Sequence, residues 1–375
     1  MEFIDLKKQY RMLKNAIDPQ IQTVLEHGQY INGPEINILE KTLSNYIGSK
    51  GCIATSSGTD ALLIALMALG IKSGDEIITT PFSFISTVET ILLLGAKPVF
   101  VDINPKTYNL DAALILGSIT PRTKAIMPVS LYGQMADFDS INSIAKKNGL
   151  AVIEDGAQSF GATSNGRKSC SVSTIGCTSF FPSKPLGCYG DGGACFSNDE
   201  SLLEGMKEIR NHGAKSRYYH VRIGINGRLD TIQAAILLGK FPQFELEVEK
   251  RANAGASYTR KINAINKNII TPEILPGNTS VFAQYTVQVN EREKIAEELR
   301  KKGIPTTVHY PTPLHMQPAI KNQIEKPTDC RLPITEAAAK RVLSLPMHPY
   351  LSESDIEKIV SILNSAVDKT AELEI

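Results

Sequence analysis

The segment TSFFPSKPLG, residues 178–187, decides the fold, and the glycine-rich segment CYGDGG follows it at 188–193. Its first four residues are typical of a strand, and the proline and glycine residues after them are typical of a loop. Lys184 is therefore predicted to lie in a tight loop directly after a strand, where a side chain can point into a binding site. Burial readily lowers the pKa of a lysine, so that its amine can form a Schiff base with an aldehyde cofactor. An isolated loop lysine, however, is usually a solvated charge.

A second segment, LAVIED at residues 150–155, gives Lys184 a partner. This short apolar run predicts a buried parallel strand with carboxylates at its carboxyl end, the end at which open α/β sheets bind ligands. Asp155 precedes Lys184 by 184 − 155 = 29 residues, enough for the connection between two nearby strands. Pyridoxal phosphate needs an aspartate facing its ring nitrogen and a lysine facing its aldehyde carbon. The pair therefore favours this cofactor.

The motifs VIEDGAQS at 152–159 and SFFPSK at 179–184 resemble those of the DegT/DnrJ/EryC1/StrS family of sugar aminotransferases. The resemblance extends from FIDL at 3–6 to SLPMHP at 344–349, with Gly156 where alanine is commoner in the family. It implies a fold-type I, pyridoxal-phosphate-dependent transferase that moves an amino group from L-glutamate to a keto sugar carried by a nucleotide. Within the family it points to a UDP-linked 3-oxo-glucuronate substrate and to a role in surface polysaccharide (O-antigen) synthesis. It also implies a cytoplasmic homodimer with shared active sites.

The resemblance implies roles for particular residues. Lys184 and Asp155 would be catalytic. The residues expected to bind the cofactor are Gly58, Thr59, Phe84, Asp155, Gln158, Ser179, Lys184 and Asn226, and those expected to bind the substrate are Arg228, His309 and Tyr310. Asn226 would reach the cofactor phosphate of the neighbouring subunit, and Arg228 suits an acidic sugar because arginine binds a carboxylate with two parallel hydrogen bonds.

Two of these expectations also have support from local sequence. SSGTD at 56–60 is a turn of small residues that opens a helix, which suits a phosphate, although the same residue types also simply cap helices. Phe84 is the expected stacking partner of the cofactor ring, whereas Phe82 is expected in the core.

Short apolar strands alternate with helices up to about residue 245, which predicts an α/β fold with a mainly parallel, doubly wound sheet. The pattern then changes. We expect a large cofactor-binding domain over residues 1–245, with an N-terminal helix that can pack on the small domain, and a smaller α+β domain over 246–375. In the latter the sequence predicts a strand over 304–309 and a helix over 335–343.

Composition excludes several function classes. The chain has 375 residues, a net charge of +1 and 42% apolar residues, so nothing attracts it as a whole to nucleic acid or to a membrane. It shows neither a signal-peptide pattern nor an apolar run of the roughly 20 residues that span a membrane. Its six cysteines lack metal-site spacing and are expected to be free, buried thiols. No metal is expected, and His348 is expected to be a packed histidine.

Alternatives remain at this point. The basic, tyrosine-rich segment NHGAKSRYYHVR at 211–222 suits either a solvated loop or an anionic sugar nucleotide. The substrate could instead be a 4-keto-6-deoxy sugar, or the protein could be a non-catalytic regulator that binds pyridoxal phosphate. Family relatives that dehydrate sugars carry histidine in place of the lysine, so Lys184 argues against that activity.

Overall fold

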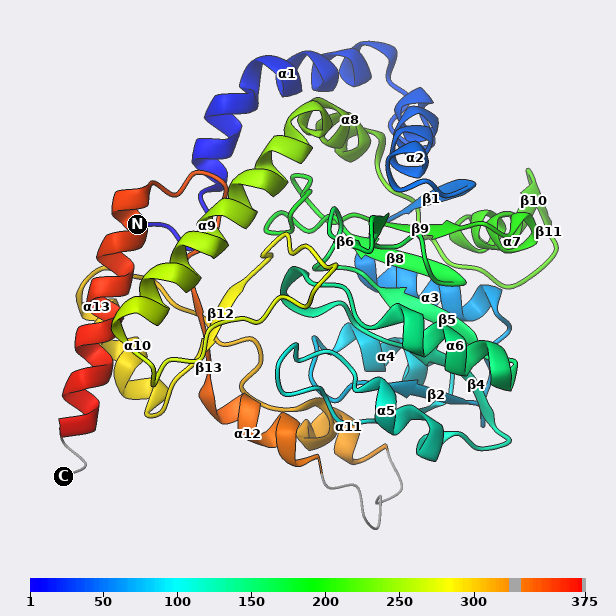
Figure 1. Cartoon of the computed structure of the whole chain (residues 1–375). Coiled ribbons are helices and arrows are strands. Elements are labelled where there is room, and N and C mark those ends of the chain that lie inside the picture. The colour runs from blue at the N-terminus through cyan, green and yellow to red at the C-terminus, as the bar shows by residue number, and fades with distance from the viewer. Residues whose placement is uncertain (324–331, 373–375) are drawn as a thin grey trace.

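A computed structural model of the chain describes residues 1–323 and 332–372. A seven-stranded sheet with the order β1-β9-β8-β5-β4-β2-β3 forms its centre (Figure 1). In that order the strands are β1 (Gly51–Thr55), β9 (Gly193–Ser197), β8 (Ile175–Ser179), β5 (Ala151–Asp155), β4 (Thr123–Met127), β2 (Glu76–Thr79) and β3 (Lys97–Phe100). Only β9 runs antiparallel to its neighbours. The predicted mainly parallel α/β sheet is confirmed.

Helices cover both faces of the sheet, because successive strand residues point to opposite sides. Ile77 and Ile153 pack with residues of α3 (Gly58–Ala68), and α4 (Ser86–Leu93) and α7 (Glu200–Arg210) contribute to the same cluster. Their neighbours Ile78 and Val152 pack against α6 (Phe138–Asn148) on the other face. Because the strands other than β9 run parallel, their carboxyl ends lie at one edge of the sheet.

Two helices that are far apart in the sequence lie side by side above the sheet (Figure 1). The N-terminal helix α1 (Leu6–His27) packs on α8 (Thr231–Lys240) through Leu13, Ile17 and Ile236. Helix α2 (Pro34–Ile47) also packs on α8, and a long helix, α9 (Phe244–Ile265), follows it after one short turn. The segment before α1 touches the C-terminal part of the chain, where Met347 N donates to Phe3 O over 3.1 Å.

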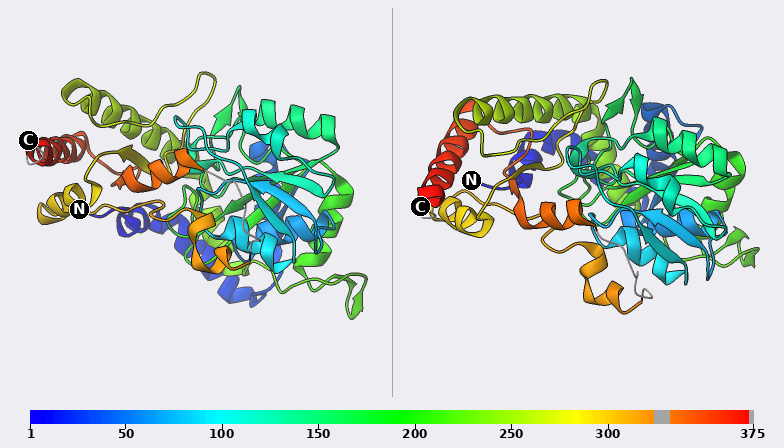
Figure 2. Two further views of the ribbon diagram at one scale, coloured as in Figure 1. Left: turned by 90° about the horizontal axis from the view of Figure 1, so that it is seen from below. Right: turned by 60° about the horizontal axis from the view of Figure 1, so that its bottom comes forward.

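The C-terminal residues form a separate core. Helix α9 packs with α10 (Arg292–Lys301), α13 (Glu353–Glu372) and the antiparallel pair β12 (Tyr285–Gln288) and β13 (Val342–Leu345). Figure 2 shows these helices gathered to one side of the sheet. Two further helices are α11 (Pro318–Lys321) and α12 (Pro333–Arg341). Residues such as Ile320 pack them against the part of the chain that carries the seven-stranded sheet. The domain boundary near residue 245 stays a prediction.

Two local predictions in the C-terminal part were wrong. Residues 304–309 form no strand, and only Thr307 pairs, in an isolated bridge with Ser344. The helix predicted over 335–343 ends at Arg341, because Val342–Leu345 pair with β12 and are fully buried. A helical pattern and a buried strand look alike over so short an apolar run, so the partner strand decides. The hairpins β6 (Thr163–Ser164)–β7 (Arg167–Lys168) and β10 (Ala214–Ser216)–β11 (Tyr219–His220) were not predicted.

Other expectations about single residues are confirmed. Phe82 is fully buried, and His348 is buried beside Arg251, so that burial and this charge lower the pKa of His348 to about 4. The cysteines that the structure describes are free and buried, namely Cys52, Cys170, Cys177, Cys188 and Cys195. Cys330 lies outside the described residues. Over the described ranges, no helix is long and apolar enough to cross a membrane.

Asp102, buried just after β3, caps α12 from a distant part of the chain. Its carboxylate accepts hydrogen bonds from Ile334 N (3.0 Å), Thr335 N (3.0 Å) and Thr335 Oγ1 (2.6 Å). We expect Asp102→Ala to lower the free energy of unfolding by about 2 kcal/mol or more, because it leaves buried donors unpaired. Asp137, an exposed residue that caps α6 through Ser140 N, is the matched control and should cost about 1 kcal/mol when replaced by alanine. Urea unfolding followed by circular dichroism measures both, and equal losses would contradict this role of Asp102.

Candidate functional site

Asp155 and Lys184 meet at the carboxyl edge of the sheet, as predicted. Asp155 is the buried last residue of β5, and its carboxylate accepts from Thr87 Oγ1 (2.8 Å) and Ala157 N (3.2 Å). Burial raises the pKa of Asp155, while Thr87, Ala157 and the charge of Lys184 oppose this rise. Burial lowers the pKa of Lys184, and Asp155 opposes that change. Since burial favours the neutral amine, Lys184 is suited to attack a carbonyl carbon.

The loop that carries Lys184 is as tight as its sequence predicts. Lys184 N donates to Phe181 O (2.8 Å), and Cys188 N donates to Phe180 O (2.8 Å), which closes the loop at both ends. Gly187 has no room for a side chain, because a Cβ there would lie 2.5 Å from Pro182 O. The loop therefore holds Lys184 in one place beyond β8.

A second group of polar residues faces this pair from the C-terminal part. Gln158 Nε2 donates to Tyr310 Oη (3.1 Å), and Gln158 Oε1 accepts from Tyr132 N (2.7 Å). Burial and the neighbouring charge of Asp155 raise the pKa of Tyr310. Burial and the charge of Lys184 lower the pKa of His309 to about 4, so this imidazole is neutral near pH 7. The charges of Lys184 and Asp155 thus act on His309 and Tyr310 respectively, although these two residues do not follow a strand.

The first turn of α3, beside the end of β8, forms a cradle of backbone N–H and hydroxyl groups. Ser57 caps the helix by accepting from Asp60 N (3.0 Å), and the backbone N–H groups of a first turn have no partner within the helix. Gly58 lies so close to the end of β8 that a Cβ there would be 2.6 Å from Ser179 Cβ. Thr59 Oγ1 lies 2.7 Å from Ser86 Oγ. The helix terminus with Thr59 and Ser179 could hold an anion.

Phe84 lies in the turn before α4. Its side chain is 55% exposed, whereas Phe82 two residues earlier is fully buried. Its ring centroid lies 6.3 Å from that of Tyr310, and the ring planes are tilted by 42°. Phe84 therefore has free surface on which a flat heteroaromatic ring can stack.

Asn226 and Arg228 lie in a different hollow. Arg228 pairs with Thr55 in an isolated bridge, and Ser56 N donates to Gly227 O (2.9 Å). A cavity of about 560 Å³ there is lined by Ser56, Ser57, Asn226 and Arg228, and neither Lys184 nor Asp155 is among its described lining residues. Arg228 Nη1 donates to Asn211 Oδ1 (2.8 Å), while its buried Nε has no hydrogen-bond partner in the described structure. Within one chain the described lining of this cavity thus includes residues at the start of α3 but not the Asp155–Lys184 pair.

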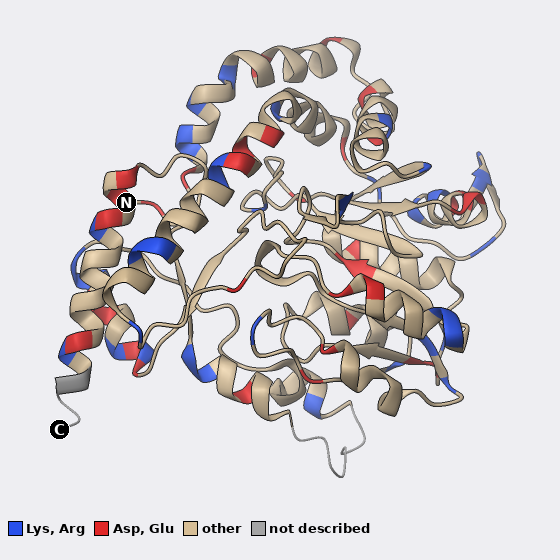
Figure 3. Ribbon diagram, viewed as in Figure 1, with Lys and Arg blue, Asp and Glu red and all other residues tan. Residues whose placement is uncertain are grey.

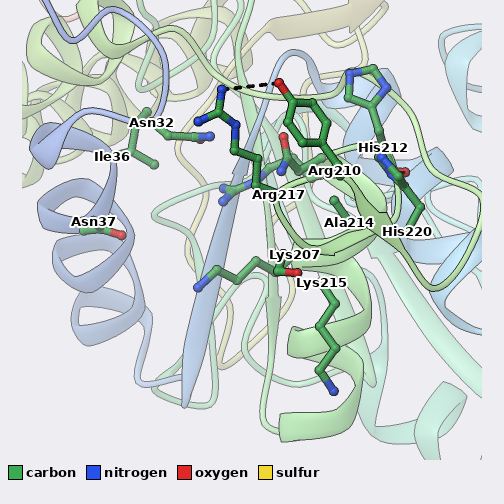
Figure 4. Close-up of a pocket in the computed structure, with 13 residues that line it drawn as sticks. Asn32, Ile36, Asn37, Lys207, Arg210, His212, Ala214, Lys215, Arg217 and His220 are labelled. Carbon is green, nitrogen blue, oxygen red and sulfur yellow. Dashed lines mark hydrogen bonds between the residues drawn. The ribbon is translucent and has the colours of Figure 1, made fainter.

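The basic segment predicted at 211–222 includes the hairpin β10–β11, which projects from the body of the molecule (Figures 1 and 2). A cavity of about 580 Å³ lies between this segment, α7 and the start of α2 (Figure 4). Basic side chains predominate among its polar lining residues, which include Lys207, Arg210, His212, Lys215, Arg217 and His220. Figure 3 shows positive residues on this hairpin, while charges of both signs alternate along the outer helices.

Sequence reasoning missed two residues that shape the site. Thr87, in the first turn of α4, orients the carboxylate of Asp155, and Tyr132 N fixes the amide of Gln158. A threonine near a helix start ordinarily indicates capping, so nothing in the local sequence assigns Thr87 to a strand end 68 residues away.

Comparisons with known proteins agree with this geometry. The profile of the DegT/DnrJ/EryC1/StrS aminotransferase family matches residues 11–364. A UDP-2-acetamido-2-deoxy-3-oxo-D-glucuronate aminotransferase from Pseudomonas aeruginosa is 54% identical over 97% of this chain and 100% of its own length. A crystal structure of a DegT/DnrJ/EryC1/StrS aminotransferase from Brucella abortus is 40% identical, with a TM-score of 0.92 over 98% of this chain and 99% of that one.

The crystal structure of NtdA from Bacillus subtilis contains bound PMP, the amine form of pyridoxal phosphate. It is 33% identical, with a TM-score of 0.88, and the match covers 95% of this chain and 82% of that chain. These likenesses confirm the expected fold-type I architecture and pyridoxal phosphate as the cofactor. The cradle at α3 fits the phosphate of this cofactor, and the exposed ring of Phe84 fits the face of its ring. The acid of Asp155 fits the ring nitrogen, and the amine of Lys184 fits the aldehyde.

The close approach of Gly58 to Ser179 generates a prediction. Gly58→Ala should weaken the binding of pyridoxal phosphate by about tenfold or more, because the new methyl group must push α3 away from the end of β8. Gly117→Ala is the matched control, since a Cβ at Gly117 meets nothing within 4 Å. Titration of the cofactor-free proteins with pyridoxal phosphate, followed by absorbance, gives both affinities. Equal affinities of the two variants would show that this contact does not shape the cradle.

Proposed function

Because the chain belongs to the DegT/DnrJ/EryC1/StrS aminotransferase family, we propose a specific reaction for it, the amination of UDP-2-acetamido-2-deoxy-3-oxo-D-glucuronate. The protein is a pyridoxal-phosphate-dependent sugar aminotransferase. The observation that carries the finer proposal is the 54% identity over 97% of the chain to an enzyme of that name. L-Glutamate is the proposed amino donor. The product would be a 3-amino sugar nucleotide for surface polysaccharide such as O-antigen, made in the cytoplasm.

Each residue of the site has a proposed task. When bound, pyridoxal phosphate supplies an aldehyde that carries the amino group and a ring that accepts electrons. Lys184 would hold the aldehyde end, and its free Nζ would move a proton between the substrate carbon and the cofactor carbon. Asp155, fixed by Thr87, would keep the ring nitrogen protonated. The remaining proposed cofactor ligands are Gly58, Thr59 and Ser179 for the phosphate, and Phe84 and Gln158 for the ring.

The proposed substrate carries a carboxylate and a diphosphate, and the chain offers positive groups for both. Arg228 lines the cavity of about 560 Å³, where its guanidinium would bind the sugar carboxylate. The basic cavity beside the β10–β11 hairpin suits the diphosphate. His309 and Tyr310, whose pKa values are shifted by the charges of Lys184 and Asp155 respectively, are proposed to bind the sugar.

We propose that two chains build each site. The segment at 218–223 exposes large apolar side chains, with Tyr218 83% and Ile223 85% exposed, as expected of a surface that a second copy covers. It leads directly to Asn226 and Arg228, which in one chain lie in a hollow apart from Lys184. A homodimer in which these two residues reach the partner's cofactor would bring the whole proposed ligand set together.

The substrate proposal is tested with two keto sugars. The 3-keto form of UDP-N-acetylglucosaminuronate, made in place by a dehydrogenase, and a 4-keto-6-deoxy UDP-sugar are each supplied with glutamate, and products are identified by mass spectrometry. We expect a 3-amino uronate from the first and no product from the second. Arg228→Ala should lower kcat/KM about 100-fold for the acidic sugar but much less for its neutral analogue, because only the former carries the carboxylate. Arg300→Ala, which breaks an exposed ion pair with Glu297 on α10, is the control.

Product from the 4-keto sugar alone would replace the proposed substrate while leaving the aminotransferase assignment intact. Equal losses for the acidic and the neutral sugar in Arg228→Ala would remove Arg228 as the reader of the carboxylate. A protein that binds pyridoxal phosphate but never exchanges its absorbance with glutamate would be the regulator that the sequence left open.

Shared sites predict complementation. Lys184→Ala and Asn226→Ala are each expected to lose nearly all activity as homodimers. In a mixed dimer, one site carries both substitutions and stays inactive. The other site combines the unchanged Lys184 of one chain with the unchanged Asn226 of its partner, so this site regains activity. Mixing differently tagged variants and assaying the purified hybrid measures this. A hybrid as inactive as its parents would place Asn226 in the same site as Lys184 of its own chain.

A further inference from the structure

A buried lysine outside the described catalytic set lies at the end of α8. Lys240 is only 3% exposed, and burial lowers its pKa to about 8. Its Nζ donates to Gly187 O (2.6 Å) and to Gln9 Oε1 (2.8 Å), and it lies 4.3 Å from the ring centroid of Tyr189. Burying a cation costs free energy unless its N–H groups make hydrogen bonds. The two hydrogen bonds of Lys240 therefore fix the positions of Gly187 and Gln9.

The first of these contacts is to the loop of Lys184. Gly187 is three residues after Lys184 and closes the turn, where a Cβ would lie 2.5 Å from Pro182 O and 2.8 Å from Phe181 O. Phe181 O is also the acceptor of Lys184 N. The ammonium of Lys240 thus binds a carbonyl in a loop that has no free space, and a shift of this carbonyl must move the backbone at Lys184.

The second contact continues into the C-terminal part of the chain. Gln9 Nε2 donates to Glu247 Oε2 (2.9 Å), and the other oxygen of Glu247 accepts from Tyr350 Oη. Gln9 belongs to α1, Glu247 to α9 and Tyr350 to the segment before α13. The amide of Gln9 has only one workable orientation, because its oxygen must face Lys240 and its nitrogen must face Glu247. The chain of bonds therefore runs without a break from Gly187 to Tyr350.

We propose that Lys240 is a positioning residue for the transamination reaction: through Gly187 it sets the direction of Lys184, and through Gln9 and Glu247 it ties the catalytic loop to the C-terminal part. This inference rests on the proposed role of Lys184. The position of a reacting group within a fraction of an ångström controls the rate, and such precision comes from the residues that support it. Lys240 acts only through the loop and would not touch the substrate.

Another lysine of the chain separates positioning from mere stabilisation. Lys168 also lies over a tyrosine, 3.8 Å from the ring centroid of Tyr46, and it pairs with Glu245 over 2.6 Å. None of these residues belongs to the catalytic loop. Lys168 and Lys240 thus share a cation–π contact and an acidic neighbourhood, but only Lys240 holds the loop of Lys184.

The test compares Lys240→Met with Lys168→Met as full-length proteins. For Lys240→Met we expect about tenfold slower uptake of pyridoxal phosphate by the cofactor-free protein and about tenfold lower kcat with unchanged KM, because Lys184 is misdirected. We also expect a shift in the pH at which the visible absorbance of the loaded protein changes. Lys168→Met should differ from wild type in its thermal midpoint alone. A Lys240→Met protein with lowered thermal stability but wild-type uptake, spectrum and kcat would overturn the proposal.

A second variant covers the case in which Lys240→Met does not fold. Gln9→Leu leaves Lys240 on Gly187 but removes the side-chain acceptor of Lys240 and the link to Glu247. Uptake of pyridoxal phosphate should therefore slow, and the pH of the absorbance change should shift in the same direction as in Lys240→Met. Wild-type values in folded Gln9→Leu would likewise overturn the proposal. The role of Lys184 is checked separately, because Lys184→Ala must lose the visible absorbance. If it kept that absorbance, the proposed function would fail and this inference with it.

Discussion

The buried pair of Asp155 and Lys184 is the interaction on which the arrangement of the site depends. Asp155 ends β5 and Lys184 follows β8, and these strands are parallel neighbours in which Asp155 lies opposite Cys177. Burial destabilises both charges, while their mutual attraction and the hydrogen bond from Thr87 compensate part of that cost. The acid proposed to face a ring nitrogen and the amine proposed to face an aldehyde thus lie at the carboxyl edge of the sheet, where open α/β sheets bind ligands.

The same edge explains why small residues surround the site. Gly58 permits the first turn of α3 to approach Ser179, and Gly187 permits the loop of Lys184 to close on itself. Close approach of backbone lets N–H groups reach a phosphate, while the exposed ring of Phe84 offers a flat ligand a surface. One chain supplies these parts but sets Asn226 and Arg228 in another hollow, and this division is the reason to propose a site shared by two chains.

Two buried polar connections join the C-terminal part of the chain to the sheet. Asp102, after β3, caps α12, and the bonds from Gly187 through Lys240, Gln9 and Glu247 reach Tyr350. Both connections use charged groups with nearly all their bonds made, which is costly to break at one partner. The segment with His309 and Tyr310 has contacts of its own: His309 Nδ1 lies 2.9 Å from Ser344 Oγ, and Tyr310 Oη accepts from Gln158 Nε2 over 3.1 Å.

The sequence by itself determined the parallel sheet and the family and predicted the Asp155–Lys184 pair, because short apolar strands and the motif around Lys184 are local patterns that do not depend on distant partners. It also predicted correctly that Phe82 and His348 are buried. Only the tertiary structure decided that residues 342–345 form a strand, that Thr87 supports Asp155 and that Lys240 holds Gly187. These roles depend on which distant residues the fold brings into contact. Residue type alone does not predict them, because a threonine or a lysine at such positions ordinarily faces solvent or caps a helix.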